Sequence, residues 1–215
     1  MIIEGAIFDM DGLMMDTERL VFENWQEIMT KKGYSYTADD FRKTIGKRRI
    51  ETEQIMKAQY GEDFPYLECA DECHVLFIEK TERDGISVKK GLFELLQVLK
   101  ERGVKTAVAT STRRPSAERV LSMTGAMPYF DAVVCGEDVT EGKPDPEVFL
   151  KAAERIDVEP HKCAALEDSP SGITAAYRAG MKTIMVPDFI EPDDEIRDML
   201  DLLCGDLEEA ISFFE

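Results

Sequence analysis

Apolar positions follow two different spacings along this chain. Residues 3–8 form a short apolar run bounded by acids, which predicts a buried strand. From about Thr17 to about Gly85 the apolar residues recur at helical spacing instead, and Thr37 followed by Asp40 is typical of a helix N-cap with its capping box. The pattern therefore predicts one strand and then a helical block of about 70 residues.

Beyond Gly85, short apolar runs alternate with helical patterns. The predicted strands span residues 104–110, 131–135, 163–167 and 182–186, and the predicted helices lie near 92–103, 115–123, 145–156, 170–179 and 206–214. Strands that alternate with helices of this length form a mostly parallel sheet covered on both faces. We expect an α/β fold, a doubly wound (Rossmann-like) mostly parallel sheet with a helical segment inserted after its first strand.

The same pattern predicts how the chain divides. We expect residues 1–15 to form the first strand of the core and the loop that follows it, residues 16–86 to form the helical insert, and residues 87–215 to complete the core. The hinges should fall near residues 14–17 and 83–88. No internal repeat or long flexible linker interrupts this arrangement.

Polar side chains follow four of the predicted strands. The segments are Asp9-Met10-Asp11-Gly12 after the first strand, Thr110-Ser111-Thr112 after the second, Lys143-Pro144 in the loop after the third, and Glu167-Asp168-Ser169 after the fourth. Ligands of open parallel sheets bind outside the carboxyl ends of the strands. We therefore expect carboxylates, hydroxyls and one ammonium to meet at one edge of the sheet.

These residue types together indicate phosphate chemistry. Carboxylates that converge from different strands repel one another unless a cation lies among them, and an all-oxygen ligand set with room for water suits Mg²⁺. Thr110 and Ser111 come just before a predicted helix N-terminus, where N–H groups and the helix dipole hold an anion. Lys143 can neutralise added charge. A metal, an anion cradle and an ammonium around paired aspartates are typical of a phosphoryl-transfer site.

Each feature also has an ordinary structural explanation. Asp-x-Asp-Gly is common in turns, Thr110 and Ser111 could cap the next helix, Lys143 could be a loop charge, and Glu167-Asp168 could cap the helix that follows them. These explanations do not account for four such segments at the ends of successive strands. The phosphoryl-transfer interpretation is therefore favoured.

Charge restricts the partners. The 215 residues include 26 Lys and Arg against 44 Asp and Glu, a formal net charge of −18, which repels nucleic acid and anionic lipid. No apolar run approaches the ~18 residues of a membrane span, and the first residues do not resemble a secretory signal. We expect a cytoplasmic protein that binds neither nucleic acid nor membrane, with a monomer as the default state.

Three basic clusters could receive an anionic substrate. They are Lys47-Arg48-Arg49, Lys89-Lys90 and Arg113-Arg114, although such clusters are usually solvated surface patches. The five cysteines are scattered and odd in number, so we expect buried, reduced thiols rather than disulfides. Cys69 and Cys73 are spaced i, i+4 on one helix face beside His74, but a structural zinc site needs a fourth ligand.

Four segments carry a family resemblance. FDMDGLMMDTE (8–18), VATST (108–112), GKPDPEVF (142–149) and LEDSPSGITAA (166–176) resemble, in this order, the motifs of the haloacid dehalogenase superfamily. The resemblance is closest to its branch of small-molecule phosphatases and β-phosphoglucomutase-like proteins. The helical insert resembles the cap of that family in position and size.

The resemblance implies roles for the core residues. Asp9 would be the nucleophile that forms an aspartyl-phosphate and also a Mg²⁺ ligand. Asp11 would be the general acid and then the base, with its main-chain carbonyl on the metal. Thr110 and the backbone N–H of Ser111 would hold the phosphoryl oxygens, and Lys143 would offset charge.

The resemblance also implies metal ligands and cap residues. Asp168 would ligate Mg²⁺ directly, and Glu167 would do so directly or through water. In the cap, Arg49 and Thr17 fall where family members contact the substrate or position the acid. Asp11 separates this chain from the metal-independent dehalogenases, which have no aspartate at that position.

Three functions remain open at this point. The favoured one is a Mg²⁺-dependent phosphatase acting on a small phosphorylated metabolite, a sugar or polyol phosphate. A β-phosphoglucomutase-type sugar phosphomutase is the first alternative, but Val21 stands where those mutases carry a histidine. A non-catalytic phosphate-binding or regulatory protein on the same fold is the second, and the complete set of acids with Lys143 argues against it.

Overall fold

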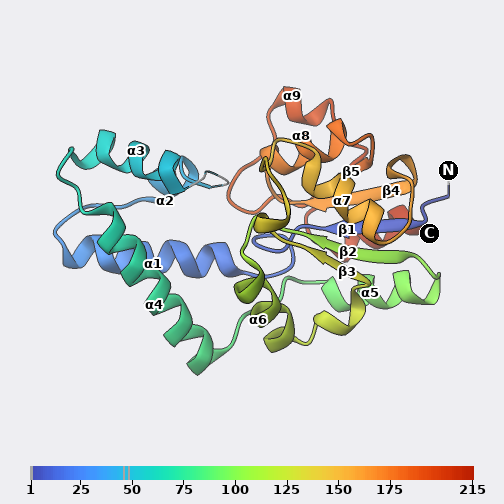
Figure 1. Cartoon of the computed structure of the whole chain (residues 1–215), viewed down its shortest axis with the longest axis horizontal. Helices are drawn as coiled ribbons and strands as arrows, with labels where there is room; N and C mark the ends of the chain where they lie inside the picture. Colours follow the sequence, from blue (N-terminus) through green and yellow to red (C-terminus); the bar gives the residue numbers. More distant parts are fainter. Residues whose placement is uncertain (1, 46, 48) are drawn as a thin grey trace. The chain divides into compact units, whose positions relative to one another are not determined.

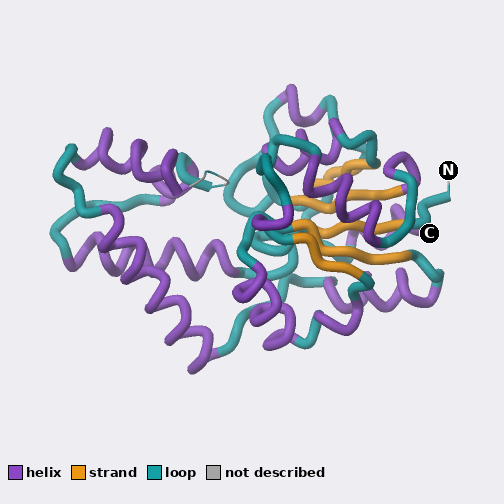
Figure 2. The backbone as a smooth tube through the Cα atoms, viewed as in Figure 1, coloured by secondary structure: helices purple, strands orange, loops and turns teal. Residues whose placement is uncertain are grey.

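The computed structural model describes residues 2–45, 47 and 49–215. The chain divides into two compact units, Met1–Asp16 with Ile86–Glu215, and Thr17–Gly85. The limits expected from the sequence pattern, after residues 15 and 86, each differ from these by one residue. The first unit is called the core and the second the cap. Among the described residues, all strands belong to the core (Figure 2).

The core contains one six-stranded sheet. Its strands are β1 (Gly5–Phe8), β2 (Lys105–Ala109), β3 (Ala132–Val134), β4 (Cys163–Glu167), β5 (Lys182–Met185) and β6 (Leu202–Leu203). Their order is β3-β2-β1-β4-β5-β6, and every pair is parallel. The doubly wound fold predicted from the alternation is confirmed, and β6 is a short strand that the pattern did not reveal.

Helices cover both faces of this sheet (Figure 1). They are α5 (Leu92–Glu101), α6 (Arg114–Thr124), α7 (Glu147–Arg155), α8 (Pro170–Arg178) and α9 (Asp194–Arg197), with 3-10 turns η1 (Met127–Tyr129), η2 (Gly136–Asp138), η3 (Pro160–Lys162) and η4 (Glu209–Phe214). Helices α7 and α8 pack on one face, and α5, α6 and η4 pack on the other. The segment predicted as a helix near 206–214 is therefore the 3-10 turn η4, a form that short terminal helices often adopt.

Small side chains let the helices lie close to the strands. Ala107, Ala109 and Ala165 of the sheet share one fully buried cluster with Ala175 and Ala176 of α8. A central parallel strand is covered on both faces, so it shows a continuous apolar run rather than alternation. Burial of both faces leaves the strand ends as the place where polar side chains can collect.

The register brings those ends to one level. Phe8, the last residue of β1, pairs with Val108 of β2 on one side and with Leu166 of β4 on the other. The next residue, Asp9, donates its backbone N–H to the Leu166 carbonyl at 3.0 Å, and the Thr110 N–H donates to the Val134 carbonyl at 3.0 Å. The register of the three strands therefore places the residues that follow β1, β2 and β4 next to one another.

The cap consists of α1 (Thr17–Lys31), α2 (Ala38–Arg42), α3 (Arg49–Tyr60) and α4 (Tyr66–Asp84). Trp25 of α1 stacks on Tyr66 of α4, with ring centroids 6.0 Å apart. The predicted N-cap is confirmed, because the Thr37 side chain accepts the Asp40 N–H and the Asp40 side chain accepts the Thr37 N–H. All five cysteines, in both units, are free and buried as expected. Within the described ranges, no helix has the length and apolar character that a membrane crossing requires.

Candidate active site

Lys143 joins two carboxylates at the carboxyl ends of the strands. Its ammonium lies 2.5 Å from Asp9 Oδ1 and 2.6 Å from Glu167 Oε1, and it donates a third hydrogen bond to the Ala109 carbonyl at 3.0 Å. An ammonium has three donors, and these contacts use all of them. The three side chains are buried, with 7% of Lys143, 9% of Asp9 and 1% of Glu167 exposed.

The loop that carries Lys143 is held against the helices of one face. The ammonium lies 5.1 Å from the ring centroid of Phe149 on α7, within the range of a cation–π contact. Arg178 of α8 donates to the Pro144 carbonyl at 3.1 Å. These contacts direct a long, flexible side chain to one place in the site.

Glu167 is fixed by the turn that starts α8. Its Oε2 accepts the N–H groups of Asp168 at 3.1 Å and Ser169 at 3.0 Å, and the Ser169 hydroxyl at 2.9 Å. Ser169 is the residue that caps the helix, since its side chain accepts the Gly172 N–H. Glu167 and Asp168 therefore do not cap α8.

Two glycines make room for these carboxylates. A Cβ at Gly172 would lie 1.8 Å from Glu167 Oε1, and a Cβ at Gly12, where φ is +83°, would lie 2.2 Å from Asp168 Oδ2. Neither glycine was singled out for the site from the sequence. The available signal was a glycine one helical turn after an acidic pair, and another directly after Asp-x-Asp.

Asp11 lies against the hydroxyls that follow β2. The Thr112 hydroxyl donates to Asp11 Oδ2 at 2.6 Å, and the Thr110 hydroxyl lies 3.4 Å from the same oxygen. Thr110 is buried, whereas Ser111 is exposed. Neither caps α6, whose N-cap is Arg113. Thr112 was not among the predicted site residues, although it completes the segment VATST.

The carboxylates perturb one another because they are buried together. Burial raises the pKa of Asp9 to about 8, with the Lys143 ammonium opposing the shift and the Glu167 and Asp11 carboxylates adding to it. Burial lowers the pKa of Lys143, but the Asp9 and Glu167 carboxylates outweigh burial and raise it. With Lys143 as the neighbouring cation, burial still favours the protonated form of Asp9 at pH values where an exposed aspartate is ionised.

The acidic side chains fit a hard metal ion. Asp9, Glu167 and Asp168 each offer a carboxylate oxygen, and these oxygens lie within 4.8 Å of one another. All three residues are buried, and oxygen-only ligands suit Mg²⁺. A fourth carboxylate, that of Asp188 after β5, has an oxygen within 4.8 Å of one from Asp168. Asp188 Oδ2 is buried and has no hydrogen-bond partner among the described residues.

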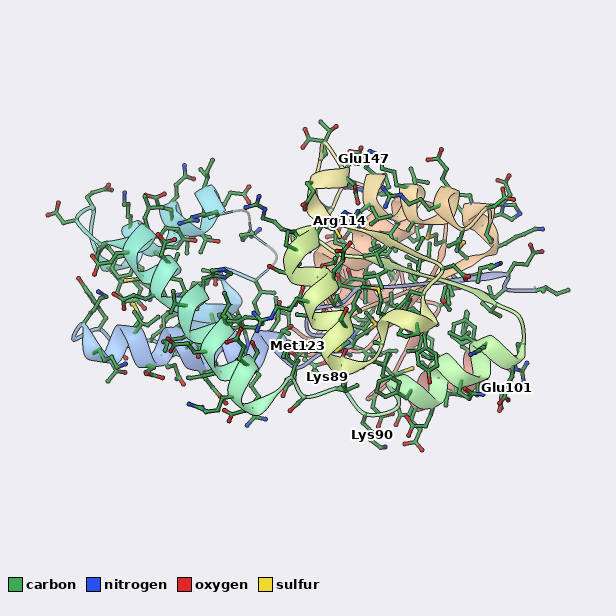
Figure 3. All side chains as sticks on the ribbon, turned by 60° about the horizontal axis from the view of Figure 1, so that its bottom comes forward. Lys89, Lys90, Glu101, Arg114, Met123 and Glu147 are labelled. Atoms are coloured by element: carbon green, nitrogen blue, oxygen red, sulfur yellow. The ribbon has the colours of Figure 1, made fainter. Side chains whose placement is uncertain are left out.

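The predicted basic clusters of the core are engaged in ion pairs with acidic side chains. Figure 3 labels Lys89 and Lys90, which lead into α5, and Arg114, which opens α6. The pairs are Lys89 with Asp16 and Asp188, Lys90 with Asp206 and Glu208, and Arg114 with Glu118 and Asp138. Lys143 contacts Asp9 and Glu167, whereas Lys89 contacts Asp188, the carboxylate after β5.

The remaining predicted residues belong to the cap. Thr17 is the first residue of α1 and is buried, with 2% of its surface exposed. Arg49 is the first residue of α3 and pairs with Asp71 of α4 at 3.0 Å on an exposed face. Arg48, of the same basic cluster, lies outside the described residues. The roles expected for Thr17 and Arg49 stay predictions.

Comparison with known proteins identifies the family. Residues 6–186 match the haloacid dehalogenase-like hydrolase family. The chain is 35% identical to the phosphorylated carbohydrates phosphatase of Thermotoga maritima, over 85% of this chain and 84% of that protein. It is 36% identical to the fructose-1-phosphate phosphatase YqaB of Escherichia coli, over 85% of this chain and 95% of that protein.

A solved structure agrees with these sequence matches. The crystal structure of CbbY from Rhodobacter sphaeroides in complex with phosphate superposes with a TM-score of 0.81 at 27% identity, covering 97% of this chain and 96% of that one. The family match spans most of the chain and includes all four strand-end segments. The resemblance inferred from those segments is thus confirmed, and the chain belongs to the haloacid dehalogenase-like hydrolase family.

Proposed function

We propose that this chain is a Mg²⁺-dependent phosphatase that hydrolyses a small phosphorylated metabolite through an aspartyl-phosphate. The observation that carries the proposal is the buried Asp9–Lys143–Glu167 group, in which one ammonium joins two carboxylates from separate segments. In the proposal, Asp9 is the nucleophile and Glu167 a metal ligand. The names of the two relatives, a phosphorylated carbohydrates phosphatase and a fructose-1-phosphate phosphatase, support a sugar or polyol phosphate as the substrate.

In the first half of the reaction, a carboxylate oxygen of Asp9 attacks the phosphorus atom. The bond between phosphorus and the leaving oxygen breaks, and Asp11 gives its proton to the leaving alkoxide. The Thr110 hydroxyl and the Ser111 N–H hold the phosphoryl oxygens. Lys143 offsets the negative charge that the phosphoryl group brings beside Asp9.

In the second half, Asp11 acts as a base. It takes a proton from a water molecule as the water oxygen bonds to phosphorus. The bond between Asp9 and phosphorus breaks, inorganic phosphate leaves, and Asp9 recovers its carboxylate. Asp11 can serve in both steps because the loss of its proton in the first half leaves a carboxylate, and a carboxylate can accept the proton of water in the second half.

Mg²⁺ would be held by Asp9, Asp168, the Asp11 carbonyl and Glu167. Glu167 would bind the ion directly or through water. The ion would supply charge stabilisation for the phosphoryl oxygens during transfer. Glu167 already accepts hydrogen bonds from the Lys143 ammonium and the Ser169 N–H. It therefore also keeps Lys143 beside Asp9. In the cap, Thr17 and Arg49 would contact the substrate or position Asp11.

The test is phosphate release from a panel of sugar, polyol and glycolytic phosphates, with and without Mg²⁺. We expect Mg²⁺-dependent release that Asp9→Asn abolishes, a loss of at least about 10⁴-fold for a nucleophile. Asp198→Asn, an exposed aspartate of α9's C-terminal end, is the matched control and should retain full activity.

The other outcomes discriminate between the remaining functions. Release that persists in Asp9→Asn would contradict the aspartyl-phosphate. Absence of release from every compound, followed by isomerisation of a sugar phosphate once a bisphosphate activator is added, would identify a mutase. Phosphate binding without turnover in either assay would identify a binding protein. Arg49→Ala tests the cap, because an unchanged kcat/KM for the best substrate would remove Arg49 from the site.

A further inference from the structure

Thr112 has no part in the reaction as proposed above, yet it makes the closest described contact to the general acid. Its hydroxyl donates to Asp11 Oδ2 at 2.6 Å, and 101 positions separate the two residues in the chain. The Thr110 hydroxyl is 3.4 Å from the same oxygen. Hydrogen bonds between hydroxyl and carboxylate oxygens are normally 2.5–3.0 Å long, so Thr112 is the stronger partner of the two.

The backbone around Thr112 is itself fixed. Its N–H donates to the Thr110 hydroxyl oxygen at 3.0 Å, and its carbonyl accepts the Gly136 N–H at 3.1 Å. Gly136 approaches the loop so closely that a Cβ there would lie 2.4 Å from the Ser111 carbonyl oxygen. A threonine side chain has few rotamers, so the hydroxyl is presented to Asp11 from a rigid position.

We propose that Thr112 is the positioning residue for the general acid and base Asp11. This inference rests on the phosphatase function proposed above. A hydroxyl can donate to the ionised carboxylate and accept from the protonated carboxyl group. Thr112 therefore holds Oδ2 in both halves of the reaction and fixes the orientation of the carboxyl group toward the leaving oxygen.

The effect depends on how much the leaving group needs an acid. A sugar alkoxide leaves only when protonated, whereas p-nitrophenolate is stable as an anion and leaves without a proton. Misplacement of a catalytic acid costs roughly tenfold to a hundredfold in rate. Loss of the Thr112 hydroxyl should therefore slow the cleavage of a sugar phosphate and leave that of p-nitrophenyl phosphate nearly unchanged.

The experiment measures kcat/KM, which reports the first phosphoryl transfer, for the best sugar phosphate and for p-nitrophenyl phosphate with Mg²⁺ present. We expect Thr112→Val, which keeps the side-chain shape, to lower kcat/KM about tenfold or more on the sugar phosphate and less than about threefold on p-nitrophenyl phosphate. Thr112→Ser restores the hydroxyl and should recover most of the loss. An equal loss on both substrates, or no loss on either, overturns the proposal.

A crystal structure of Thr112→Val gives a second readout that does not depend on turnover. We expect the Asp11 carboxylate to leave its position beside residue 112 or to occupy more than one rotamer. An Asp11 side chain that keeps its wild-type rotamer overturns the positioning role. If wild-type protein releases phosphate from neither substrate, the phosphatase function fails, and the Asp11 rotamer still decides whether Thr112 positions it.

Discussion

Among the lysines that bridge a pair of carboxylates, Lys143 of the core and Lys32 of the cap offer a direct comparison. Lys143 lies 2.5 and 2.6 Å from Asp9 and Glu167, and Lys32 lies 2.6 and 3.0 Å from Glu68 and Glu72. The distances are nearly the same, but the surroundings differ. Only 7% of the Lys143 side chain is exposed against 23% of Lys32, and Glu68 is 63% exposed against 1% for Glu167.

The difference shows that burial, not the N–O distance, determines whether the pKa of a carboxylate beside lysine is raised, as for Asp9, or lowered, as for Glu68. In the cap, hydrogen bonds from Lys32 lower the pKa of Glu68, as expected for ions that water also solvates. In the core, burial raises the pKa of Asp9 to about 8 even with Lys143 in contact. The core lysine is therefore required to keep two acids together, and the cap lysine is not.

The largest contrast is expected from removing each ammonium. Lys143→Met leaves two buried carboxylates without a counter-ion, and breaking a buried pair in this way costs about 3–5 kcal/mol. Lys32→Met breaks a solvated pair and should leave the urea midpoint nearly unchanged. Urea unfolding of both variants without metal, at pH 8, measures the difference. A Lys143→Met protein as stable as Lys32→Met would contradict the distinction.

A smaller contrast is expected from one methyl group in each unit. Gly172→Ala in the core places a Cβ where Glu167 Oε1 stands, while Gly33→Ala in the cap meets nothing within 4 Å and must only adopt a φ of +83°. We expect about 1–2 kcal/mol of destabilisation from the strained backbone at Gly33 and about 1–3 kcal/mol from overpacking at Gly172.

The two glycine variants should differ clearly in their affinity for Mg²⁺. Calorimetric titration should show at least about tenfold weaker binding for Gly172→Ala, because ligands held by their surroundings lose affinity when those surroundings shift. Gly33→Ala should bind Mg²⁺ as the wild type does. Equal Mg²⁺ affinity in both variants would mean that Glu167 has no part in the metal site.

The smallest effects concern stability as a function of pH, for which Asp9 of the core and Asp40 of the cap should contribute with opposite signs. For Asp9, burial raises the folded pKa to about 8 from its ordinary value of 3.8, so metal-free stability falls as pH rises from about 4 to 8. Asp9→Asn should therefore match or exceed the wild-type Tm at pH 8. For Asp40 of the cap, burial is outweighed by hydrogen bonds from Gln59 and Thr37, which lower its pKa.

Asp40 should accordingly contribute stability above its ordinary pKa of 3.8 and lose that contribution as pH falls toward its lower folded value. Asp40→Asn weakens the capping box, at a cost of about 1 kcal/mol at pH 7. The cost should shrink at pH 3. Thermal unfolding of both variants at pH 3, 5 and 8 checks the two signs, and a common direction for Asp9 and Asp40 would contradict them.

The sequence located most of the core site because a parallel sheet has simple rules. Once β1, β2 and β4 are recognised as strands, Asp9, Thr110 and Asp168 must follow them at one edge. The same rules do not reveal that Thr112 contacts Asp11, or that Gly12 and Gly172 make room for carboxylates. These contacts depend on loop conformation, which apolar spacing does not encode.

The sequence alone predicts the alternation of strands and helices, the insertion of a helical block after β1, and the family that the four strand-end segments resemble. Those properties follow from local periodicity and from residue types at strand ends. The sequence also predicted Lys143 at that edge of the sheet, but its contacts with Asp9 and Glu167, and the hydrogen bond from Thr112 to Asp11, come from the tertiary structure. The reason is physical: a lysine 134 positions from its partner is brought to Asp9 by the folded sheet and its packed loops, and burial then sets the strength of the contact.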